Sequence, residues 1–417
     1  MTKRSATSVP SLKHLAFFEA LCEHEEQSPS ALAATAGLLS MRMVDHWLLA
    51  GSMIVEPESV SVQSARAAIM ALPPADPLRE VLLGLVNTMQ TLREVDAQPI
   101  LPRLFAYAGL LEKRGQLAVA SDVYETVVRL GEEQFETDLL IDAHMRLGFC
   151  RRMLGQLDEA EAAYSMAGKI AKRRKEPSRF QHSRVGVAKV ALARGNLPVA
   201  DAMLQDVVRE CAAHGFEQVH AMALHDNATV ARMRGEHTRA VCLAYSALEL
   251  TQSTSERERV LNDLAAIFVS MGRFEEAQTT LLIQNATAIT REVRCIARVS
   301  LMSLAARRCD REQFEHFRSS LIDTVLPPDL HVNFLIESAR GERAFGSEDA
   351  AKTLLASAHE VARTHGLNRS VFEVEGLLAI PDRTPEPTRS GEVPVLDPDP
   401  AAHVFDGLRR MLATIAG

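Results

Sequence analysis

Apolar residues recur along most of this chain at intervals of three and four positions, the spacing that places them on one face of an α-helix. This pattern predicts helices over residues 12–26, Ser64–Leu72 and Leu78–Val95. The apolar faces of the first and last of these helices are formed by Leu15, Phe18, Leu21 and Cys22, and by Val81, Leu82, Leu85, Val86 and Met89. We therefore expect residues 1–97 to form a separate helical domain.

A single glycine returns with near-constant spacing through residues 98–379. It stands at Gly115, Gly155, Gly195, Gly235, Gly272 and Gly346. Successive steps are 40, 40, 40, 37 and 74 residues, and the last is twice 37, with Cys309 at the missing point. Self-similarity with a period of this size is the signature of a solenoid built from stacked helical repeats.

Small residues occupy two further fixed positions in most copies. Those seven residues before the glycine are Ala108, Gly148, Ala188, Ala228, Ala265 and Ala339, and those five residues after it are Ala120, Ala160, Ala200, Ala240, Ala277 and Ala351. Such residues let two helices approach closely. Each glycine is thus expected to end one helix and to turn the chain into its partner, which gives seven helix pairs from Leu101 to about Leu378.

The copy over residues 145–164 contains the segments MRLGF, GQLDEA and AY, and Gly272 opens the similar segment GRFEEA. At these residues the chain resembles the tetratricopeptide repeat (TPR) family. The resemblance implies an all-α fold, a right-handed TPR-like solenoid of about seven helix pairs with an N-terminal helical capping domain. The units exceed the family's usual 34 residues, so longer helices are expected, as in kinesin light chains and some peptide-sensing bacterial regulators. The copy around Cys309 departs from the pattern, because Met302 and Phe314 replace small residues.

One segment of the N-terminal domain has a second interpretation. Residues 32–37 followed by residues 40–44 look like the helix-turn-helix that precedes such repeats in peptide-sensing transcription regulators. However, residues 1–100 contain seven Lys or Arg against eleven Asp or Glu, whereas specific DNA binding depends on several basic contacts to phosphate. We favour a capping domain over the first repeat, and nucleic acid is not an expected partner.

The composition changes after the solenoid. Residues 380–400 contain six prolines, which indicates an extended linker, and residues 401–417 predict a final amphipathic helix. Its apolar face consists of Val404, Leu408, Met411, Leu412 and Ile415. This face needs a partner: the last repeat around Leu355 and Val371, the groove of the same molecule, or another protein. We favour the last repeat.

Composition and motifs give no indication of catalysis. The net charge of −8 is modest, and the six cysteines are too scattered for a metal or redox motif. His220 and His225 are five residues apart and face different sides of one helix, and the sequence has no phosphate loop, dinucleotide fingerprint or nucleophile elbow. We expect no enzyme, no metal site and no cofactor. Without a signal peptide or a long apolar run, a cytoplasmic protein without a membrane anchor is expected.

The resemblance also implies where a ligand would bind. In this family the first helix of each pair lines a concave groove, through side chains that lie thirteen, ten, nine, six, three and two residues before the turn glycine. The resulting candidates for groove residues are Arg146, Phe149, Arg152, Lys189, His225, Arg232 and Asn262. Four of them, Arg146, Arg152, Lys189 and Arg232, carry positive charge and predict an acidic ligand. The structural alternative is that these cations pair with Glu112, Asp226 and Asp263 across the groove.

Three functions are compatible with these observations. The leading hypothesis is a non-enzymatic intracellular adaptor that binds a peptide or protein segment in the groove. A peptide-sensing transcription regulator with a degenerate helix-turn-helix and a regulator of a kinase or phosphatase are the alternatives. A second basic group, which comprises Lys169, Lys172, Arg173, Arg174, Lys175 and Arg179, is interpreted as a solvated helix end, because cations at a helix C-terminus are favoured by the macrodipole alone.

Overall fold

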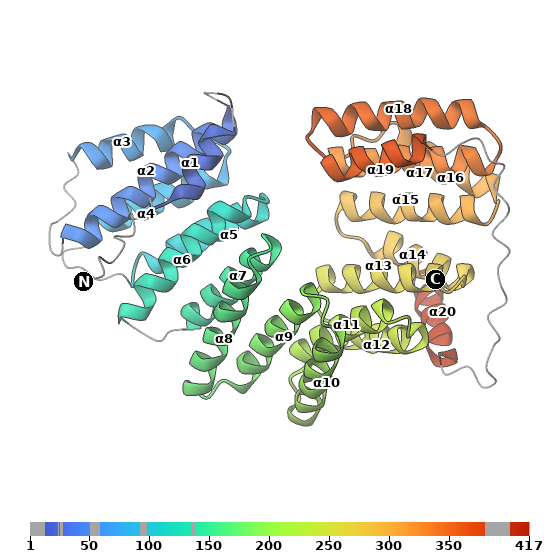
Figure 1. The fold of residues 1–417 in the computed structure, drawn as a ribbon, viewed down its shortest axis with the longest axis horizontal. Helices are drawn as coiled ribbons and strands as arrows, with labels where there is room; N and C mark the ends of the chain where they lie inside the picture. Colours follow the sequence, from blue (N-terminus) through green and yellow to red (C-terminus); the bar gives the residue numbers. More distant parts are fainter. Residues whose placement is uncertain are drawn as a thin grey trace, which may run out of the picture. The chain divides into compact units, whose positions relative to one another are not determined.

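The computed structural model describes residues 13–23, 25, 28–50, 59–91, 98–134, 138–379 and 401–416, and within these ranges the chain forms twenty α-helices and no strand (Figure 1). The all-α class expected from the sequence is therefore confirmed. The chain divides into two compact units, Met1–Met203 and Leu204–Gly417, with the division inside α10 (Leu197–His214). Each unit contains its own buried apolar clusters.

Four helices precede the repeats. They are α1 (Leu15–Cys22), α2 (Pro29–Ala50), α3 (Val60–Met70) and α4 (Pro77–Thr91). The predicted apolar face of α4 is correct, since Leu82, Leu85, Val86 and Met89 are fully buried. The predicted face of α1 is partly correct: Phe18 and Leu21 are partly buried against the core, but Leu15 is 48% exposed and the fully buried residue of this helix is Phe17.

The segment that resembles a helix-turn-helix is a single continuous helix, α2, so the turn expected near Gly37 does not form. A Cβ atom at Gly37 would lie 2.0 Å from the Tyr107 hydroxyl and 2.5 Å from the Phe17 ring. Gly37 therefore serves a close contact between helices and not a turn. The sequence alone does not reveal this, because the contacting rings come from α1 and α5 (Leu101–Lys113).

The seven predicted helix pairs are confirmed. They are α5 with α6 (Leu117–Gln134), α7 (Asp138–Met153) with α8 (Leu157–Arg173), α9 (Pro177–Ala193) with α10, α11 (Glu217–Met233) with α12 (His237–Leu250), α13 (Thr254–Ser270) with α14 (Phe274–Thr287), α15 (Arg291–Arg307) with α16 (Arg311–Ile322), and α17 (Pro328–Ala344) with α18 (Glu348–Thr364). A single helix, α19 (Asn368–Leu378), follows the last pair.

The turn inside each pair has one backbone geometry. The six repeat glycines have φ angles between +71° and +83°, a region that side chains with a Cβ rarely adopt. In the second pair the Gly155 amide donates to the Arg152 carbonyl, and the Gln156 amide donates to the Arg151 carbonyl. Cys309 has a φ of +56° in the copy that lacks the glycine. This cysteine makes the same turn at the cost of backbone strain.

The small residues of the repeat are buried where two helices meet. All six alanines that follow the turn glycine are inaccessible to solvent. In the best copy the Tyr164 ring lies over two glycines, since an added Cβ would come within 2.8 Å of it at Gly148 and 2.3 Å at Gly186. The close approach predicted from the small residues is therefore confirmed.

The copy around Cys309 packs by a compensating exchange of size. Met302 and Phe314, which replace small residues, are both fully buried. A Cβ at Gly341 would lie 2.1 Å from the Phe314 ring, so a glycine on α17 makes the space that the larger residue on α16 occupies. The pair α15 and α16 thus keeps its place in the stack despite its departure from the pattern.

The final helix, α20 (Ala402–Ala416), packs on α12 and α14 within the second unit (Figure 1). Val404, Phe405 and Leu408 are buried there. The expectation that this helix covers the last repeat is wrong. It packs instead on helix pairs that lie two to three pairs earlier in the chain. The expected linker, residues 380–400, lies outside the described residues.

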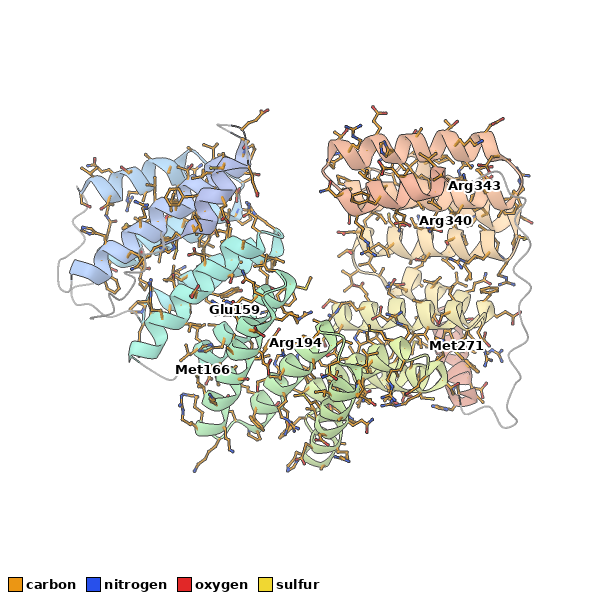
Figure 2. All side chains as sticks on the ribbon, in the orientation of Figure 1. Glu159, Met166, Arg194, Met271, Arg340 and Arg343 are labelled. Carbon is orange, nitrogen blue, oxygen red and sulfur yellow. The ribbon has the colours of Figure 1, made fainter. Side chains whose placement is uncertain are left out.

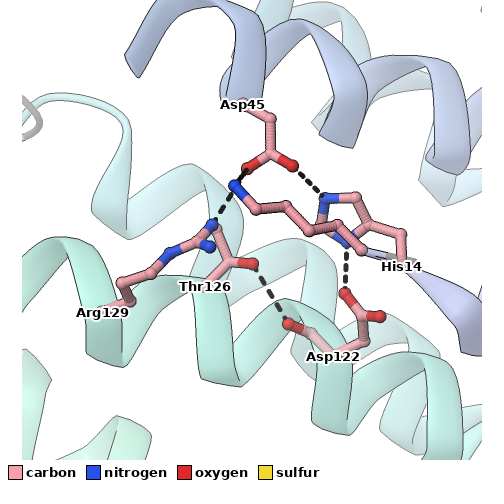
Figure 3. Close-up of polar contacts among 6 residues, drawn as sticks. His14, Asp45, Asp122, Thr126 and Arg129 are labelled. Atoms are coloured by element: carbon pink, nitrogen blue, oxygen red, sulfur yellow. Dashed lines mark hydrogen bonds and ion pairs between the residues drawn. The ribbon is translucent and has the colours of Figure 1, made fainter. Parts of the chain in front are cut away.

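A buried charge network connects α1 and α2 to the first repeat (Figure 3). The His14 imidazole bonds through Nδ1 to Asp122 of α6 and through Nε2 to Asp45 of α2, at 3.1 Å for the latter. Arg129 of α6 pairs with the same Asp45 carboxylate at 2.9 Å. Burial alone would lower the pKa of His14, but the hydrogen bonds and charges of Asp122 and Asp45 outweigh it and raise the pKa to about 9. His14 is therefore a buried cation between two carboxylates at neutral pH.

The strained turn at Cys309 yields a stability prediction. Cys309→Gly is expected to raise the free energy of unfolding by roughly 0.5–1 kcal/mol, because glycine adopts a positive φ without steric cost. Chemical denaturation followed by circular dichroism measures the change. Cys22→Gly is the matched control: this exposed cysteine ends α1, where glycine should lower stability. Equal or lower stability of Cys309→Gly would contradict the assignment of strain.

The His14 network predicts a pH-dependent stability. The pKa of His14 is about 9 in the folded chain and 6.5 at its ordinary value, so its contribution is complete below pH 6.5 and is lost as pH rises through 9. His14→Asn, which tolerates the left-handed φ of 64°, should lower the free energy of unfolding by up to about 3 kcal/mol at pH 6 and by much less at pH 10. Urea denaturation at both pH values measures this difference.

The exposed His214 supplies the control for this experiment. Its side chain is 58% exposed, so His214→Asn should change stability little at either pH. An equal loss for His14→Asn at pH 6 and pH 10 would show that packing, and not the charge of the imidazolium, holds the N-terminal helices in place.

Candidate functional site

The second unit contains a cavity of about 330 Å³ between the first helices of three successive pairs, α13, α15 and α17. It is lined by Asn262, Ala265, Ala266, Val269, Leu281, Val299, Ser300, Ser303, Leu304, Arg307, Asn333 and Glu337. Most of these residues occupy the positions, counted back from the turn residue, that were expected to face a groove. The cavity is thus produced by the repeat itself, with Cys309 as the turn residue of the sixth copy.

Most polar side chains that line this cavity have no hydrogen-bond or ion-pair partner among the described residues. Within the described part of the chain, Asn262, Ser300, Arg307 and Asn333 make no side-chain hydrogen bond or ion pair. Asn262 lies on one wall and Asn333 on the other, with Ser300 and Arg307 on α15 between them. Each amide offers both a donor and an acceptor, so the cavity presents hydrogen-bonding groups on all three helices.

One polar group of the cavity is fixed. Glu337 is 8% exposed and accepts a hydrogen bond from the Ser303 hydroxyl of the neighbouring helix. Arg340, which Figure 2 labels, pairs with this carboxylate one helical turn away and also bonds Glu373 of α19 at 2.8 Å. A buried carboxylate with these partners has its charge satisfied. Glu337 therefore shapes the wall and holds α15 against α17.

The floor of the cavity is apolar. Leu281, Val299 and Leu304 are between 1% and 3% exposed, and Ala265 and Val269 of α13 complete the apolar lining. An apolar floor with a few converging polar groups is the usual composition of a ligand site. The arrangement suits a short segment that buries one apolar group and bonds through polar atoms on either side of it.

The predicted residues of the first unit form a separate group. Arg146 pairs with Glu112 at 3.1 Å, and Glu112 also accepts a hydrogen bond from Tyr124 at 3.0 Å. This pairing is the one that the structural alternative predicted. Arg152 stacks over the Phe149 ring at 5.7 Å, and its Nε atom is buried without a hydrogen-bond partner. Of these residues, Arg152 alone therefore has a clear unsatisfied donor.

The remaining predicted residues have different surroundings. Lys189 is half-buried on α9. In the second unit, His225 bonds Asp263 at 2.7 Å. Arg232 is exposed near the end of α11 and makes no ion pair with the described residues. Asn262 is the one member of the predicted set that lines the cavity.

The sequence interpretation missed five polar residues of the cavity, namely Ser300, Ser303, Arg307, Asn333 and Glu337. The repeat spacing in the sequence is sufficient to identify them. The same offsets, counted back from Cys309 and Gly346, select all five. The repeat positions of the sixth and seventh copies therefore extend the predicted site to α15 and α17.

Other candidate features have structural roles. In the second basic group, Arg174 pairs with Asp138 and Glu176, and Arg179 pairs with Asp142 and the same Glu176. These contacts agree with the interpretation of this group as a helix end. Within the described ranges, no three His, Cys, Asp or Glu side chains form a group that could hold a metal ion, and no helix is long and apolar enough to cross a membrane.

Comparison with solved structures gives distant matches. The apo form of RapI shows 14% identity over 85% of this chain and 97% of its own, with a TM-score of 0.48. The quorum sensor NprR from B. thuringiensis shows 11% identity over 87% and 91%, with a TM-score of 0.47. The Rap conjugation regulator of plasmid pLS20, bound to the Phr* peptide, shows 12% identity over 78% and 96%, with a TM-score of 0.45.

Comparison with curated proteins gives no match. Comparison with protein families is decisive. The model of the MalT-like TPR region matches residues 23–314, which is more than half of the chain and extends from the N-terminal helices into the sixth helix pair. The chain therefore belongs to the MalT-like TPR family.

Proposed function

We propose that this protein is a non-enzymatic cytoplasmic adaptor that binds a peptide or protein segment along the first helices of its repeats. The cavity between α13, α15 and α17 is the observation that carries this proposal. The side chains of Asn262, Arg307 and Asn333 have no partner among the described residues, lie beside an apolar floor, and come from three successive first helices. These groups match a polypeptide segment, which presents backbone donors and acceptors alternating with side chains.

We further propose that the bound segment is acidic. Arg307 projects from the cavity lining without an ion pair among the described residues. In the first unit Arg152 carries a buried donor without a partner. A charge-assisted hydrogen bond from such a guanidinium to a carboxylate contributes about 1.5–3 kcal/mol. Because arginine matches the planar carboxylate, Asp, Glu or a terminal carboxylate is the expected contact.

The cavity offers a weak basis for catalysis. Ser303 donates to Glu337, a pair that resembles a nucleophile beside a base. A carboxylate is a weak base toward a serine hydroxyl at neutral pH, and no histidine or lysine lines this cavity to relay the proton. The Ser303–Glu337 bond instead joins two neighbouring helices, which supports a binding role.

The alternative function, a peptide-sensing transcription regulator, was based on a helix-turn-helix in the N-terminal domain. The residues in question form the continuous helix α2, and Gly37 is used for contact with Phe17 and Tyr107. The described N-terminal helices therefore offer no recognition helix at the expected place. A binding role without DNA contact is the simpler proposal.

The charge of the ligand is tested by selection from a displayed library of short random peptides on the full chain. We expect acidic sequences whose affinity, measured by fluorescence anisotropy, falls by at least about tenfold in Arg307→Glu. Arg363→Glu, at an exposed position of α18, controls for net charge. Affinity should also fall with added salt. Selection of neutral sequences, or equal loss in both variants, would contradict the proposal.

The first unit is tested in the same assay by Arg152→Glu combined with Lys189→Glu. A loss of affinity in this variant as well as in Arg307→Glu would extend the binding surface to both units. A loss in Arg307→Glu alone would restrict it to the second unit.

The position of the ligand is tested by filling the cavity. Ala266 is exposed on α13 and lines the cavity, so Ala266→Trp should occupy the space above the apolar floor without disturbing the core. We expect binding of the selected peptides to be lost and the thermal unfolding temperature to stay unchanged. Ala356→Trp, at an exposed alanine of α18, is the matched control. Retained affinity in Ala266→Trp would move the site elsewhere.

A further inference from the structure

The second unit holds its own amphipathic helix on a separate surface. Helix α20 packs against α12 and α14 (Figure 1). The surface that receives it, here called the helix seat, consists of Tyr245 of α12, Arg257 and Phe268 of α13, and Arg273 of the following turn. These residues are distinct from those that line the cavity.

The fit between the helix and the seat depends on a glycine. A Cβ at Gly407 would lie 1.8 Å from the Tyr245 hydroxyl oxygen and 2.5 Å from its Cζ atom. Glycine inside a helix weakens that helix relative to almost any other residue. Gly407 stands at the one point of α20 where the Tyr245 ring approaches most closely. The complementarity is therefore specific and exceeds a general apolar match.

Aromatic and cationic contacts hold the two sides together. The Phe405 ring packs on Phe268 with ring centres 5.7 Å apart, and the Arg273 guanidinium lies over the Phe405 ring, 3.7 Å from its centre. At the far end Arg257 contacts the Met411 sulfur at 3.1 Å. The apolar stripe of α20 is thus recognised by rings and by arginine side chains that frame the seat.

The composition of the seat differs from that of the contacts between repeats. Arg273 also pairs with Glu276 and its side chain is 27% exposed, whereas the contacts between repeats consist mainly of buried alanine and leucine. A surface of tyrosine and arginine tolerates water when its partner leaves, because its polar atoms become solvated. The seat therefore has the character of a binding surface, and it belongs to helices that the repeat already holds.

We propose that the helix seat is a second binding site of this protein, which takes an amphipathic helix with an apolar stripe and a glycine at its centre, and that α20 is its tethered and exchangeable occupant. The linker of residues 380–400 makes this binding intramolecular. A covalent connection of about twenty residues supplies an effective concentration of roughly millimolar, so α20 stays bound in the intact chain even where its affinity as a free peptide is modest.

The experiment uses the full chain with a protease-recognition sequence placed between residues 385 and 395. After cleavage, the fragment that contains α20 should co-elute with the remainder at high protein concentration and separate from it on dilution. A labelled peptide of residues 401–416 should then bind the seat, with a dissociation constant of roughly micromolar to tens of micromolar, as expected without the tether. The helical circular dichroism of the remainder should persist after separation.

Two peptide variants test the specificity of the seat. Gly407→Leu strengthens the helix but places bulk against Tyr245, so the peptide should bind at least about tenfold more weakly. Arg409→Leu adds the same side chain on the exposed face of α20 and should bind like the original. Tyr245→Ala in the full chain should reduce the loss of peptide affinity that Gly407→Leu causes.

Three results would overturn the proposal. The remainder could unfold when the fragment leaves, which would make α20 an integral part of the core. The fragment could fail to rebind as a free peptide. Finally, Gly407→Leu and Arg409→Leu could bind equally well, which would reduce the seat to an unspecific apolar surface.

Discussion

Contact between a wide aromatic ring and a glycine on a facing helix is the constraint on which much of this structure depends. Tyr164 lies over Gly148 and Gly186, and Phe314 lies over Gly341. In each case the missing side chain on one helix makes the space that the ring fills, because a helix interface tolerates neither a void nor an overlap. The same relation links Tyr107 to Gly37 and Tyr245 to Gly407, so it also fixes the N-terminal helices and the final helix.

This constraint explains which parts of the fold are visible in the sequence. The helix pairs were predicted because their small residues repeat with a fixed period, and the backbone at each turn glycine confirms the reason. Gly37 belongs to no repeat, and its partners are distant in the sequence, so a local pattern suggested a turn where a close contact exists. The docking of α20 was predicted wrongly for the same reason, since the complement of Gly407 is a single ring on α12.

In the candidate site, too, the features that repeat are predictable from the sequence and the contacts between distant residues are not. Repeat position alone selects residues on the first helix of each pair. It identifies Asn262 and, with Cys309 and Gly346 as turn residues, the other polar residues that line the cavity. It does not show which charges are already neutralised. Arg146 and His225 occupy suitable positions, yet Glu112 and Asp263 pair with them. Partners of this kind come from neighbouring repeats, and their distances depend on helix packing that the sequence does not specify.

Helix α13 gives the second unit a physical link between its two surfaces. Its Asn262 and Ala266 line the cavity, while its Phe268 and Arg257 contact α20. A helix is stiff along its length and its neighbours are close-packed, so a displacement that improves one contact moves the groups of the other.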